Sequence, residues 1–387
     1  MENSYNTLSE ILSSGALCIT LSVIIFALCA AQIALYFWLY QRIATYRLMS
    51  KPLIREEEPG VSVVMALFVE DAEYLDYRLP VLLTQDYSKF EVVLVYVGNN
   101  EYFFKDIQAL QNHYPNLTPI HIDSSPRYPV SVKRALNIGI KGAKYDFIVT
   151  TSYDAIPNSE RWLSLLAKGF QYGDIVMGYC GMEQKDSFAN RIIREYQLNK
   201  ALAWISSAIR GRAYASSHNA LGFKKSIYFD VRGFNHLDMN IGIDDLFVQQ
   251  IATPENVSVV LSPRATCTER IWGDFKWWVQ QARMLRSTYR HYPKGVMRYT
   301  IIELALRALF FAAVVTALIL LHWQFKLAAL AVAIVRYLVV LFIFVRNTQR
   351  LGESRLASSH ILYDFIEPGL RLFIALTPRI KGTKTWH

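Results

Sequence analysis

The chain has 387 residues, of which 52% are hydrophobic and 19% are charged, and its formal net charge is +9. With a positive mean hydropathy, this balance favours one sizeable soluble domain joined to membrane spans and argues against a polytopic transporter. The positive charge fits either a nucleic acid or the anionic cytoplasmic face of a membrane. We favour the membrane and expect no nucleic-acid partner, because many lysines and arginines flank apolar runs.

The first apolar run extends from Gly15 to Tyr40 and carries almost no charge. At about 1.5 Å per residue it is long enough to cross a ~30 Å hydrocarbon core. Acidic residues precede it and basic residues follow it: Glu2 and Glu10, then Arg42, Arg47 and Lys51. The positive-inside rule therefore predicts that residues 1–14 are external and that the linker 41–59 is cytoplasmic.

Two further apolar runs, Leu304 to His322 and Phe325 to Val345, are separated by only two residues. They predict a tight transmembrane hairpin with spans at 301–322 and 325–345. Basic residues bracket the hairpin at Lys294 and Arg298 before it, and at Arg346, Arg350 and Arg355 after it. Both ends of the hairpin are therefore predicted to be cytoplasmic.

Charged side chains also lie near the ends of these runs or inside them: Glu303, Arg307, Lys326 and Arg336. We interpret them as snorkelling or paired rather than as parts of a transport path. In the tail, 346–387, the stretch Ser359–Leu376 is apolar on one side and is interrupted by Pro368. It predicts an interfacial amphipathic helix. The chain is thus predicted to be a multi-pass protein of the inner (plasma) membrane.

The soluble part, residues 60–293, alternates strand and helix patterns. Strands are predicted at Val61–Leu67, Phe90–Val97, Phe147–Thr151 and Asp174–Tyr179, and helices at Ala72–Thr84, Ser131–Ala143 and Phe188–Gly211. This alternation predicts an α/β fold with a mostly parallel sheet, whose ligands bind at the carboxyl ends of the strands.

Short sequence signals follow these elements in a fixed order. They are Glu70, Gln85-Asp86-Tyr87, Ala135-Leu136-Asn137-Ile138-Gly139, Ser152 to Pro157, Asn219, Gly233-Phe234, Asp244 to Phe247, and Gln280 with Arg283. As a set they resemble the membrane-bound family-2 glycosyltransferases, which have the GT-A fold, a Rossmann-like fold of nucleotide-diphospho-sugar transferases. The resemblance covers nearly the whole soluble region. It implies transfer of a sugar from a nucleoside diphosphate with the help of a divalent cation.

The resemblance makes Asp154 the second acid of a DxD motif. It implies that Asp154 is a ligand of Mg²⁺ or Mn²⁺, which neutralises the charge of the leaving diphosphate. Ser152 replaces the first acid; it can hydrogen-bond a ribose hydroxyl but is a poor ligand for a hard cation. The cation is therefore expected to bind weakly. The alternative role of Asp154 is to cap the turn Asn158–Glu160.

The resemblance also implies that Glu70 and Tyr96 contact the donor and that Asn219 belongs to the acceptor loop. The acid pair that helps the family hold the base is Tyr96-Val97 here, and Val97 cannot accept a hydrogen bond. Tyr96 either stacks on the base or is a buried strand tyrosine. The neighbouring His218 is interpreted as a hydrogen-bonded structural residue.

Inverting transfer needs a carboxylate that takes the proton of the acceptor hydroxyl. In related chains three acids follow the glycine at 242, whereas here Ile243 replaces the first. If the base is that first acid, it is lost; if it is a later one, it is Asp244 or Asp245. Both acids could instead stabilise the dipole of the helix that follows.

Gln280 and Arg283 resemble the QxxRW motif, with Met284 in place of the tryptophan. One helical turn apart, they share a helix face, and Arg283 is predicted to clamp a diphosphate. A lipid headgroup is the alternative partner. The nearby Trp272, Trp277 and Trp278 are interpreted as an interfacial aromatic belt rather than as sugar-stacking groups.

These features favour a membrane-anchored inverting glycosyltransferase. Its expected partners are a nucleotide-sugar donor, a lipid-linked or membrane-proximal glycan acceptor, and membrane lipids. The replaced acids favour a second hypothesis, in which the chain is a catalytically impaired homologue that binds a partner or a glycan.

The charge pattern also predicts the topology. Because basic residues follow the first span and bracket the hairpin, we expect residues 60–293 on the cytoplasmic side. Reporter fusions or the labelling of introduced cysteines will map the two sides of the membrane. A map that places Ser152 on the external side would contradict this topology.

Overall fold

The computed structural model describes residues 15–125, 127, 129–234 and 241–376. Their contacts divide the chain into two compact units. The membrane unit consists of the described residues within Met1–Ala44, Pro293–Thr348 and Ser354–Thr377. The α/β unit consists of Thr45–Tyr292 and Gln349–Glu353.

The predicted linker 41–59 belongs to the α/β unit from Thr45 onward. Arg55 donates a hydrogen bond to the carbonyl of Phe170 (2.6 Å) and forms an ion pair with Asp174. This segment is therefore packed on the α/β unit and does not act as a free tether.

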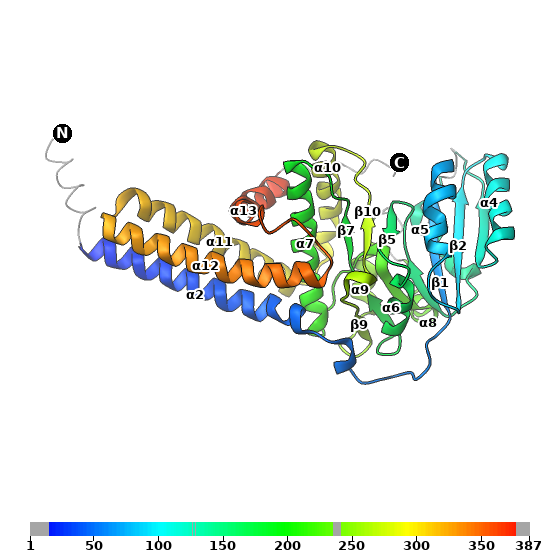
Figure 1. Ribbon diagram of the computed structural model, residues 1–387, viewed down its shortest axis with the longest axis horizontal. Helices are drawn as coiled ribbons and strands as arrows, with labels where there is room; N and C mark the ends of the chain where they lie inside the picture. Colours follow the sequence, from blue (N-terminus) through cyan, green and yellow to red (C-terminus); the bar gives the residue numbers. More distant parts are fainter. Residues whose placement is uncertain (1–14, 126, 128, 235–240, 377–387) are drawn as a thin grey trace. The chain divides into compact units, whose positions relative to one another are not determined.

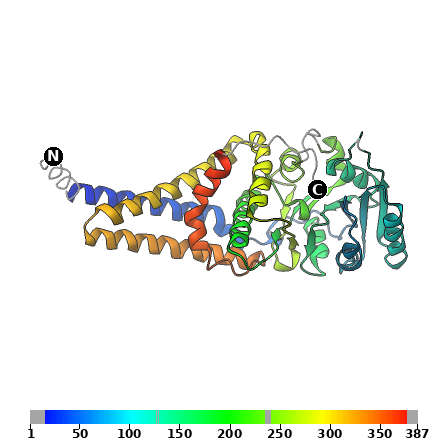
Figure 2. The ribbon, with the colours of Figure 1, turned by 90° about the horizontal axis from the view of Figure 1, so that it is seen from above.

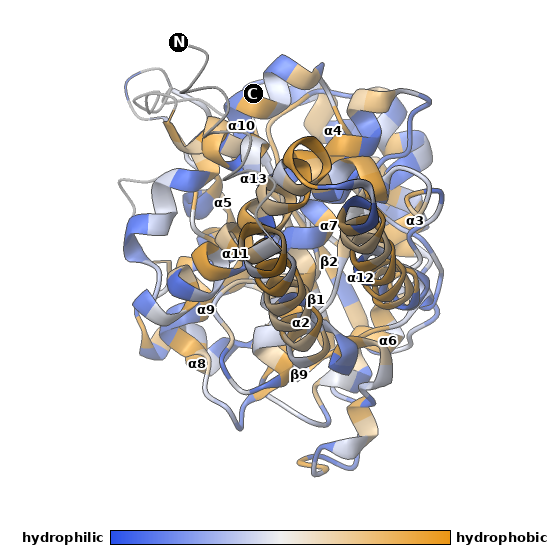
Figure 3. Cartoon of the chain, turned by 90° about the vertical axis from the view of Figure 1, so that its left-hand side faces the viewer, coloured by the Kyte–Doolittle hydropathy of each residue, from blue (hydrophilic) through white to orange (hydrophobic). Residues whose placement is uncertain are grey.

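Four helices build the membrane unit: α2 Gly15–Thr45, α11 Lys294–Leu320, α12 Trp323–Arg350 and α13 His360–Leu376. Figure 2 shows α2, α11 and α12 side by side, and Figure 3 shows that their surfaces are mostly hydrophobic. Among the described residues, these three helices are long and apolar enough to cross a membrane. Helices α2 and α12 contain the predicted spans 15–40 and 325–345 and continue to Thr45 and Arg350, whereas α11 ends at Leu320, two residues before the predicted end of its span.

The charged residues of α11 are paired inside the helical bundle. Arg307 donates to the hydroxyl of Tyr36 (2.6 Å) and to the carboxylate of Glu303 (2.7 Å). It also forms a buried ion pair with Glu367 of α13. The interpretation of these charges as paired is confirmed for Arg307 and Glu303.

The buried arginine of α12 is paired in the same way. Arg336 donates to Gln32 Oε1 (2.9 Å) and forms an ion pair with Asp364 of α13. Gln32 in turn donates to the backbone carbonyl of Leu306 (3.0 Å). Since an unpaired charge away from water is costly, these contacts specify how the four helices pack against one another.

Helix α13 turns its charged face toward the bundle and an apolar face away from it. Asp364 and Glu367 are buried, and Pro368 lies inside the helix. The exposed apolar residues are Ile361, Leu362, Phe365, Leu372, Phe373 and Leu376. An exposed apolar face of this size is what a helix at a lipid boundary requires.

The α/β unit contains a seven-stranded sheet in the order β3-β2-β1-β4-β8-β6-β9. Figure 1 labels its strands β1, β2 and β9. The strands are β1 Val61–Leu67, β2 Phe90–Val97, β3 Leu117–Ile122, β4 Phe147–Thr150, β6 Ile175–Met177, β8 Leu221–Lys224 and β9 Val257–Val259. Only β8 is antiparallel to its neighbours β4 and β6. The predicted α/β fold with a mostly parallel sheet is confirmed.

A second, three-stranded sheet has the order β5-β10-β7. Its strands are β5 Ala155–Pro157, β7 Cys180–Met182 and β10 Cys267–Glu269. The antiparallel pairing of β5 with β10 places Glu269 opposite Ala155. This small sheet therefore brings a late part of the chain to the segment that directly follows β4.

The remaining elements of the α/β unit are helices. They are the 3-10 turns η1 Leu48–Ser50, η3 His218–Ala220, η4 Pro263–Ala265 and η5 Arg286–His291, the π-helical segment η2 Tyr74–Arg78, and α3 Leu79–Leu83, α4 Glu101–His113, α5 Val132–Gly142, α6 Trp162–Gly169, α7 Phe188–Ile209, α8 Lys225–Asp230, α9 Leu246–Ile251 and α10 Phe275–Leu285. Ser131 caps α5 by accepting a hydrogen bond from the backbone amide of Arg134 (3.3 Å). The predicted helices Ser131–Ala143 and Phe188–Gly211 are thus found within about two residues of their expected ends.

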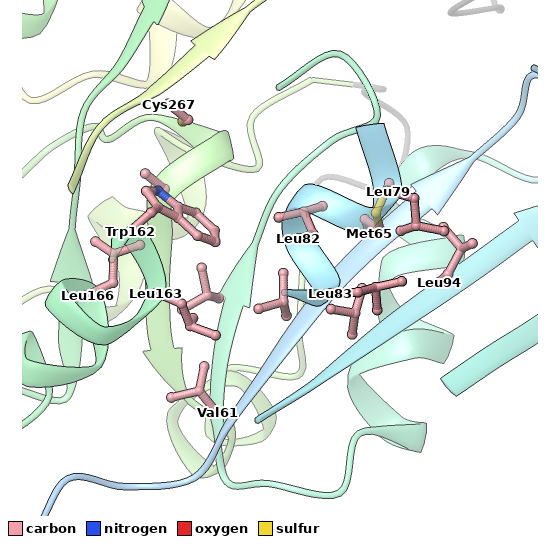
Figure 4. Packing of buried hydrophobic residues seen from close by; sticks show 14 of the residues in the cluster. Val61, Met65, Leu79, Leu82, Leu83, Leu94, Trp162, Leu163, Leu166 and Cys267 are labelled. Carbon is pink, nitrogen blue, oxygen red and sulfur yellow. The ribbon is translucent and has the colours of Figure 1, made fainter. Parts of the chain in front are cut away.

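The core of this unit lies between the sheet and its helices. Figure 4 shows Trp162 and Leu163 of α6 near Leu82 and Leu83, with β1 beside them. On the other face α5 approaches the sheet through Gly139, where a Cβ atom would lie only 2.6 Å from a methyl group of Val64. The glycine is therefore needed for close packing of helix on strand.

The buried ion pair of Arg336 and Asp364 predicts a stability effect. Replacing Asp364 with Asn leaves the guanidinium uncompensated in the interior, which typically costs about 3–5 kcal/mol. We expect a clearly lower Tm for the purified protein in detergent. In contrast, the double variant Arg336→Met/Asp364→Leu should recover most of the loss, because apolar side chains of similar volume replace the pair. A double variant less stable than Asp364→Asn would contradict this account.

Candidate active site

Polar side chains gather at the carboxyl ends of three neighbouring parallel strands. Glu70 follows β1, Tyr96 lies near the end of β2, and Ser152 and Asp154 follow β4. Ser152 is half-buried, and its carbonyl accepts a hydrogen bond from the amide of Ala155 (3.1 Å), which closes the turn. This edge of an open parallel sheet is where ligands bind.

Tyr96 is fully buried, with its ring stacked near His121 (ring centroids 5.4 Å apart) and Phe104. Its hydroxyl donates to Glu70 Oε1 (2.9 Å), and the side-chain amide of Asn100 donates to Glu70 Oε2 (2.7 Å). Tyr96 is therefore a buried strand tyrosine, the second of its two predicted roles, because its ring has no exposed face on which a base could stack. Glu70 is exposed at the rim and is held in position by these two donors.

Asp154 is surrounded by aromatic and basic residues. Trp272 Nε1 donates to its Oδ1 (2.6 Å). Its backbone carbonyl accepts from Arg78 Nη2 (3.0 Å) and from the amide of Arg270 (3.0 Å). Burial raises the pKa of Asp154, whereas the hydrogen bond from Trp272 and the charges of Arg78 and Arg270 act against that rise. Trp272 is thus in contact with the candidate site residue Asp154.

Glu269, at the end of β10, is a site residue that the sequence pattern did not reveal. The side-chain amide of Asn219 donates to its Oε2 (3.0 Å), which places Asn219 at the site as well. Burial, followed by the charges of Asp154 and Asp244, raises the pKa of Glu269 to about 7. Asp154 and Asp244 therefore both lie within electrostatic reach of Glu269. The only signal in the sequence was an acid on a very short strand.

The adjacent acids Asp244 and Asp245 have different surroundings. Asp245 is buried, and its Oδ1 accepts from the amide of Leu246 (2.7 Å) at the start of α9. Its Oδ2 accepts from the hydroxyls of Thr288 (2.5 Å) and Tyr292 (2.8 Å). Asp244 is half-buried, and burial, followed by the charge of Asp245, raises its pKa to about 6. The geometry makes Asp245 a structural helix cap and leaves Asp244 as the acid suited to proton transfer.

A pocket of about 650 Å³, including its open mouth, has Glu269 as the one acid among the described residues of its lining. Glu269, Arg270 and Lys200 form its polar wall. Most of the remaining lining is apolar or aromatic and includes Tyr196, Trp277, Trp278, Leu285 and Tyr289. Trp277 and Trp278 therefore line the pocket, and the aromatic-belt interpretation of them stays a prediction. A mostly apolar pocket with a few polar groups at one end is typical of a small-molecule site.

The predicted motif residues of α10 do not line this pocket. Gln280 is exposed and Arg283 is half-buried, whereas the neighbouring Gln281 is among the lining residues. Because one residue along a helix turns a side chain by about 100°, the motif marked the correct helix but not the face that adjoins the pocket. His218 is buried, and burial lowers its pKa to about 4, so its ring is neutral. Its Nδ1 has no partner in the described part of the chain, contrary to the expected hydrogen-bonded ring.

The donor set around Asp154 does not fit a resident divalent cation. One carboxylate oxygen already accepts the N–H of Trp272, and Ser152 offers only a hydroxyl. Within the described ranges, no group of three or more His, Cys, Asp or Glu side chains could hold a metal ion. Mg²⁺ is usually bound by one or two carboxylates together with substrate phosphates and water, so these residues would hold a cation only with the phosphates of a donor.

The model of glycosyl transferase family 21 matches residues 20–374. The chain belongs to glycosyl transferase family 21. The prediction of a glycosyltransferase is thereby confirmed, whereas membership of family 2 is not. No curated protein matches this family-21 chain.

Solved structures show the fold of this family-21 glycosyltransferase. It is similar to a mannosyltransferase from Pyrobaculum calidifontis that is described in complex with GDP-Man and Mn²⁺. The TM-score is 0.52 and the sequence identity is 18%, and the match covers 89% of this chain and 99% of that chain. A second match, with a TM-score of 0.40 and 12% identity, is residues 1–349 of TarS from S. aureus in complex with UDP-GlcNAc, over 80% of this chain and 92% of that chain. The first likeness supports the GT-A-like fold.

The different surroundings of the two acids predict different effects of the same substitution. Asp245→Asn replaces the oxygen that accepts hydrogen bonds from the hydroxyls of Thr288 and Tyr292. A buried polar group left without a partner lowers the free energy of unfolding by about 1–3 kcal/mol. We expect a lower Tm for Asp245→Asn and no loss of Tm for Asp244→Asn, whose raised pKa makes the ionised carboxylate unfavourable in the fold. Thermal unfolding of both variants in the same detergent tests this. Equal losses of stability would contradict the structural role of Asp245.

The raised pKa of Glu269 predicts a pH dependence of stability. A carboxyl group whose folded pKa lies above its unfolded value destabilises the fold progressively as pH rises from about 4.5 to about 7. Glu269→Gln keeps an acceptor for Asn219 but carries no charge. It should therefore raise the Tm at pH 8 and change it little at pH 4. A variant that lowers the Tm at pH 8 would show that the ionised carboxylate is favourable in the fold.

Proposed function

We propose that this family-21 glycosyltransferase is a membrane-anchored inverting enzyme. It moves a sugar from a nucleoside-diphosphate donor to a lipid-linked or membrane-proximal glycan acceptor. The observation that carries the proposal is Glu269, which lines an aromatic pocket, pairs through β10 with the segment that follows Asp154, and lies within electrostatic reach of Asp154 and Asp244. The mannosyltransferase of the same fold, described with GDP-Man, supports a nucleotide sugar as the donor.

Asp244 is the proposed base. Its pKa of about 6 lies close to neutral pH, where a general base is most effective. In the transfer, the acceptor hydroxyl attacks the anomeric carbon and its proton passes to Asp244, while the nucleoside diphosphate leaves from the opposite face. Asp245 does not compete for this role, because hydrogen bonds occupy both of its oxygens.

The membrane helices support an acceptor that is itself at the membrane. The three long apolar helices and the basic residues that flank them favour anchoring in the inner (plasma) membrane, with the α/β unit on the cytoplasmic side. The aromatic and aliphatic lining of the pocket suits an acceptor with an apolar part. The exposed apolar face of α13 suits contact with membrane lipids.

The replaced acids favour the second candidate, a catalytically impaired homologue with a binding role. Val97 and Ile243 stand where the family resemblance implies acids, and both side chains are buried. Because Asp245 is a helix cap, only Asp244 remains for proton transfer in this segment. The two candidates differ in whether the full-length protein turns over a donor.

Turnover of nucleotide sugars tests the proposal. The full-length protein in detergent is assayed for release of nucleoside diphosphate from a panel that includes GDP-Man and UDP-GlcNAc, with and without membrane lipid extract. We expect Asp244→Asn to reduce turnover by about a hundredfold, the usual scale for a lost general base, with little change in donor affinity. The exposed Asp230, at the end of α8, provides the matched control Asp230→Asn, which should retain activity.

Two outcomes would contradict the proposed enzyme. If the folded wild type neither turns over nor binds any donor, the binding-partner alternative remains. If Asp244→Asn and Asp230→Asn are equally active, Asp244 is not the base.

A further inference from the structure

The leaving diphosphate of a nucleotide sugar develops negative charge that the site has to stabilise. In many enzymes of this kind a divalent cation does so, but the side chains around Asp154 do not form a cation site on their own. A fixed positive charge is the other physical solution, and two arginines lie beside Asp154. This inference rests on the proposed function, since it concerns the same donor site.

Arg78 has an unusual environment. It ends the π-helical segment η2, and its Nη2 donates to the backbone carbonyl of Asp154 (3.0 Å). Its Nε and Nη1 are buried and have no hydrogen-bond partner among the described residues. A buried guanidinium with two unpaired nitrogens is costly, so a partner for them is expected. An anionic oxygen pair matches the planar fork of donors best.

Arg270 provides the second positive charge. Its backbone amide donates to the same carbonyl of Asp154 (3.0 Å), and its guanidinium lies over the ring of Trp272, 4.2 Å from the centroid. The residue is exposed and lines the pocket. Stacking on Trp272 fixes the direction of the guanidinium and leaves its N–H edge available to a ligand.

Asp154 organises this arrangement. Its carbonyl accepts from both arginines, and its carboxylate accepts from Trp272, on which Arg270 stacks. One residue at the end of β4 therefore positions two guanidinium groups. In this arrangement Asp154 is a positioning residue for cations that belong to the chain, not a ligand of a bound one.

From this geometry we infer that Arg78 and Arg270 bind the diphosphate of the donor and supply the positive charge that a divalent cation supplies elsewhere. Donor binding then does not require a metal. The ligand is recognised as a diphosphate, so UDP and GDP both serve as probes. Because the contact is between charges, binding should weaken as the ionic strength rises.

Titration calorimetry of the full-length protein in detergent tests the inference. UDP and GDP are titrated once in EDTA and once in excess Mn²⁺. We expect similar Kd values in both conditions. Arg270→Gln should weaken binding by roughly ten- to a hundredfold, the scale of one or two charge-assisted hydrogen bonds. Arg78→Lys keeps the charge but loses the fork of donors, and should also weaken binding.

Two further variants complete the test. Arg264→Gln changes an exposed arginine of η4 and is the matched control, which should bind like the wild type. Asp154→Asn removes a negative charge near the diphosphate, so binding in EDTA should persist. Since Arg270 is exposed, Arg270→Gln is expected to fold, and its result stands even if a variant of Arg78 does not fold.

The outcomes separate this inference from the proposed function. Binding that EDTA abolishes and Mn²⁺ restores would overturn the inference and leave the transferase intact. Binding of Arg270→Gln and Arg78→Lys with wild-type affinity would overturn it too. If neither nucleotide binds the folded wild type in either condition, both the inference and the proposed donor site are wrong.

Discussion

Antiparallel pairing of β5 with β10 places Glu269 opposite Ala155, directly after Asp154. This backbone contact determines where the charged groups of the site lie. It brings Glu269, Arg270 and Trp272 to the end of β4, although they are far from it along the chain. Burial, and then the charges of Asp154 and Asp244, raise the pKa of Glu269 there. The pocket, the candidate base and the arginine pair all adjoin this contact.

The hydrogen-bond partners of each carboxylate in the α/β unit indicate whether it stabilises the fold or is suited to proton transfer. Asp245 has donors on both oxygens, and Glu353 is held by Arg194 (2.6 Å) and the hydroxyl of Tyr179 (2.7 Å). Such fully paired carboxylates stabilise the fold but have no free capacity for a proton. Burial and neighbouring charge raise the pKa values of Asp244 and Glu269, and pKa values perturbed in this way are common among catalytic acids.

In the membrane unit, paired charges determine how the helices pack. In lipid, an unpaired charge is expensive, so Arg307 and Arg336 direct which helices meet. Both have acidic partners on α13, a helix whose outer face is apolar. The polar contacts therefore lie inside the bundle, and the apolar surface is left for the surroundings. Helix packing without a hydrophobic driving force depends on such specific contacts.

The sequence by itself indicated the three long apolar helices, the α/β class, four of the strands and the helices α5 and α7, because hydrophobic periodicity is a local property. It also indicated Asp154 and Asp244, since each follows a recognisable element. The tertiary structure decided the roles: it buried the ring of Tyr96, made Asp245 a cap, and turned Gln281 instead of Gln280 toward the pocket. It alone revealed Arg78, Glu269 and Arg270 at one site, because strand pairing between remote segments leaves no periodic trace in the chain.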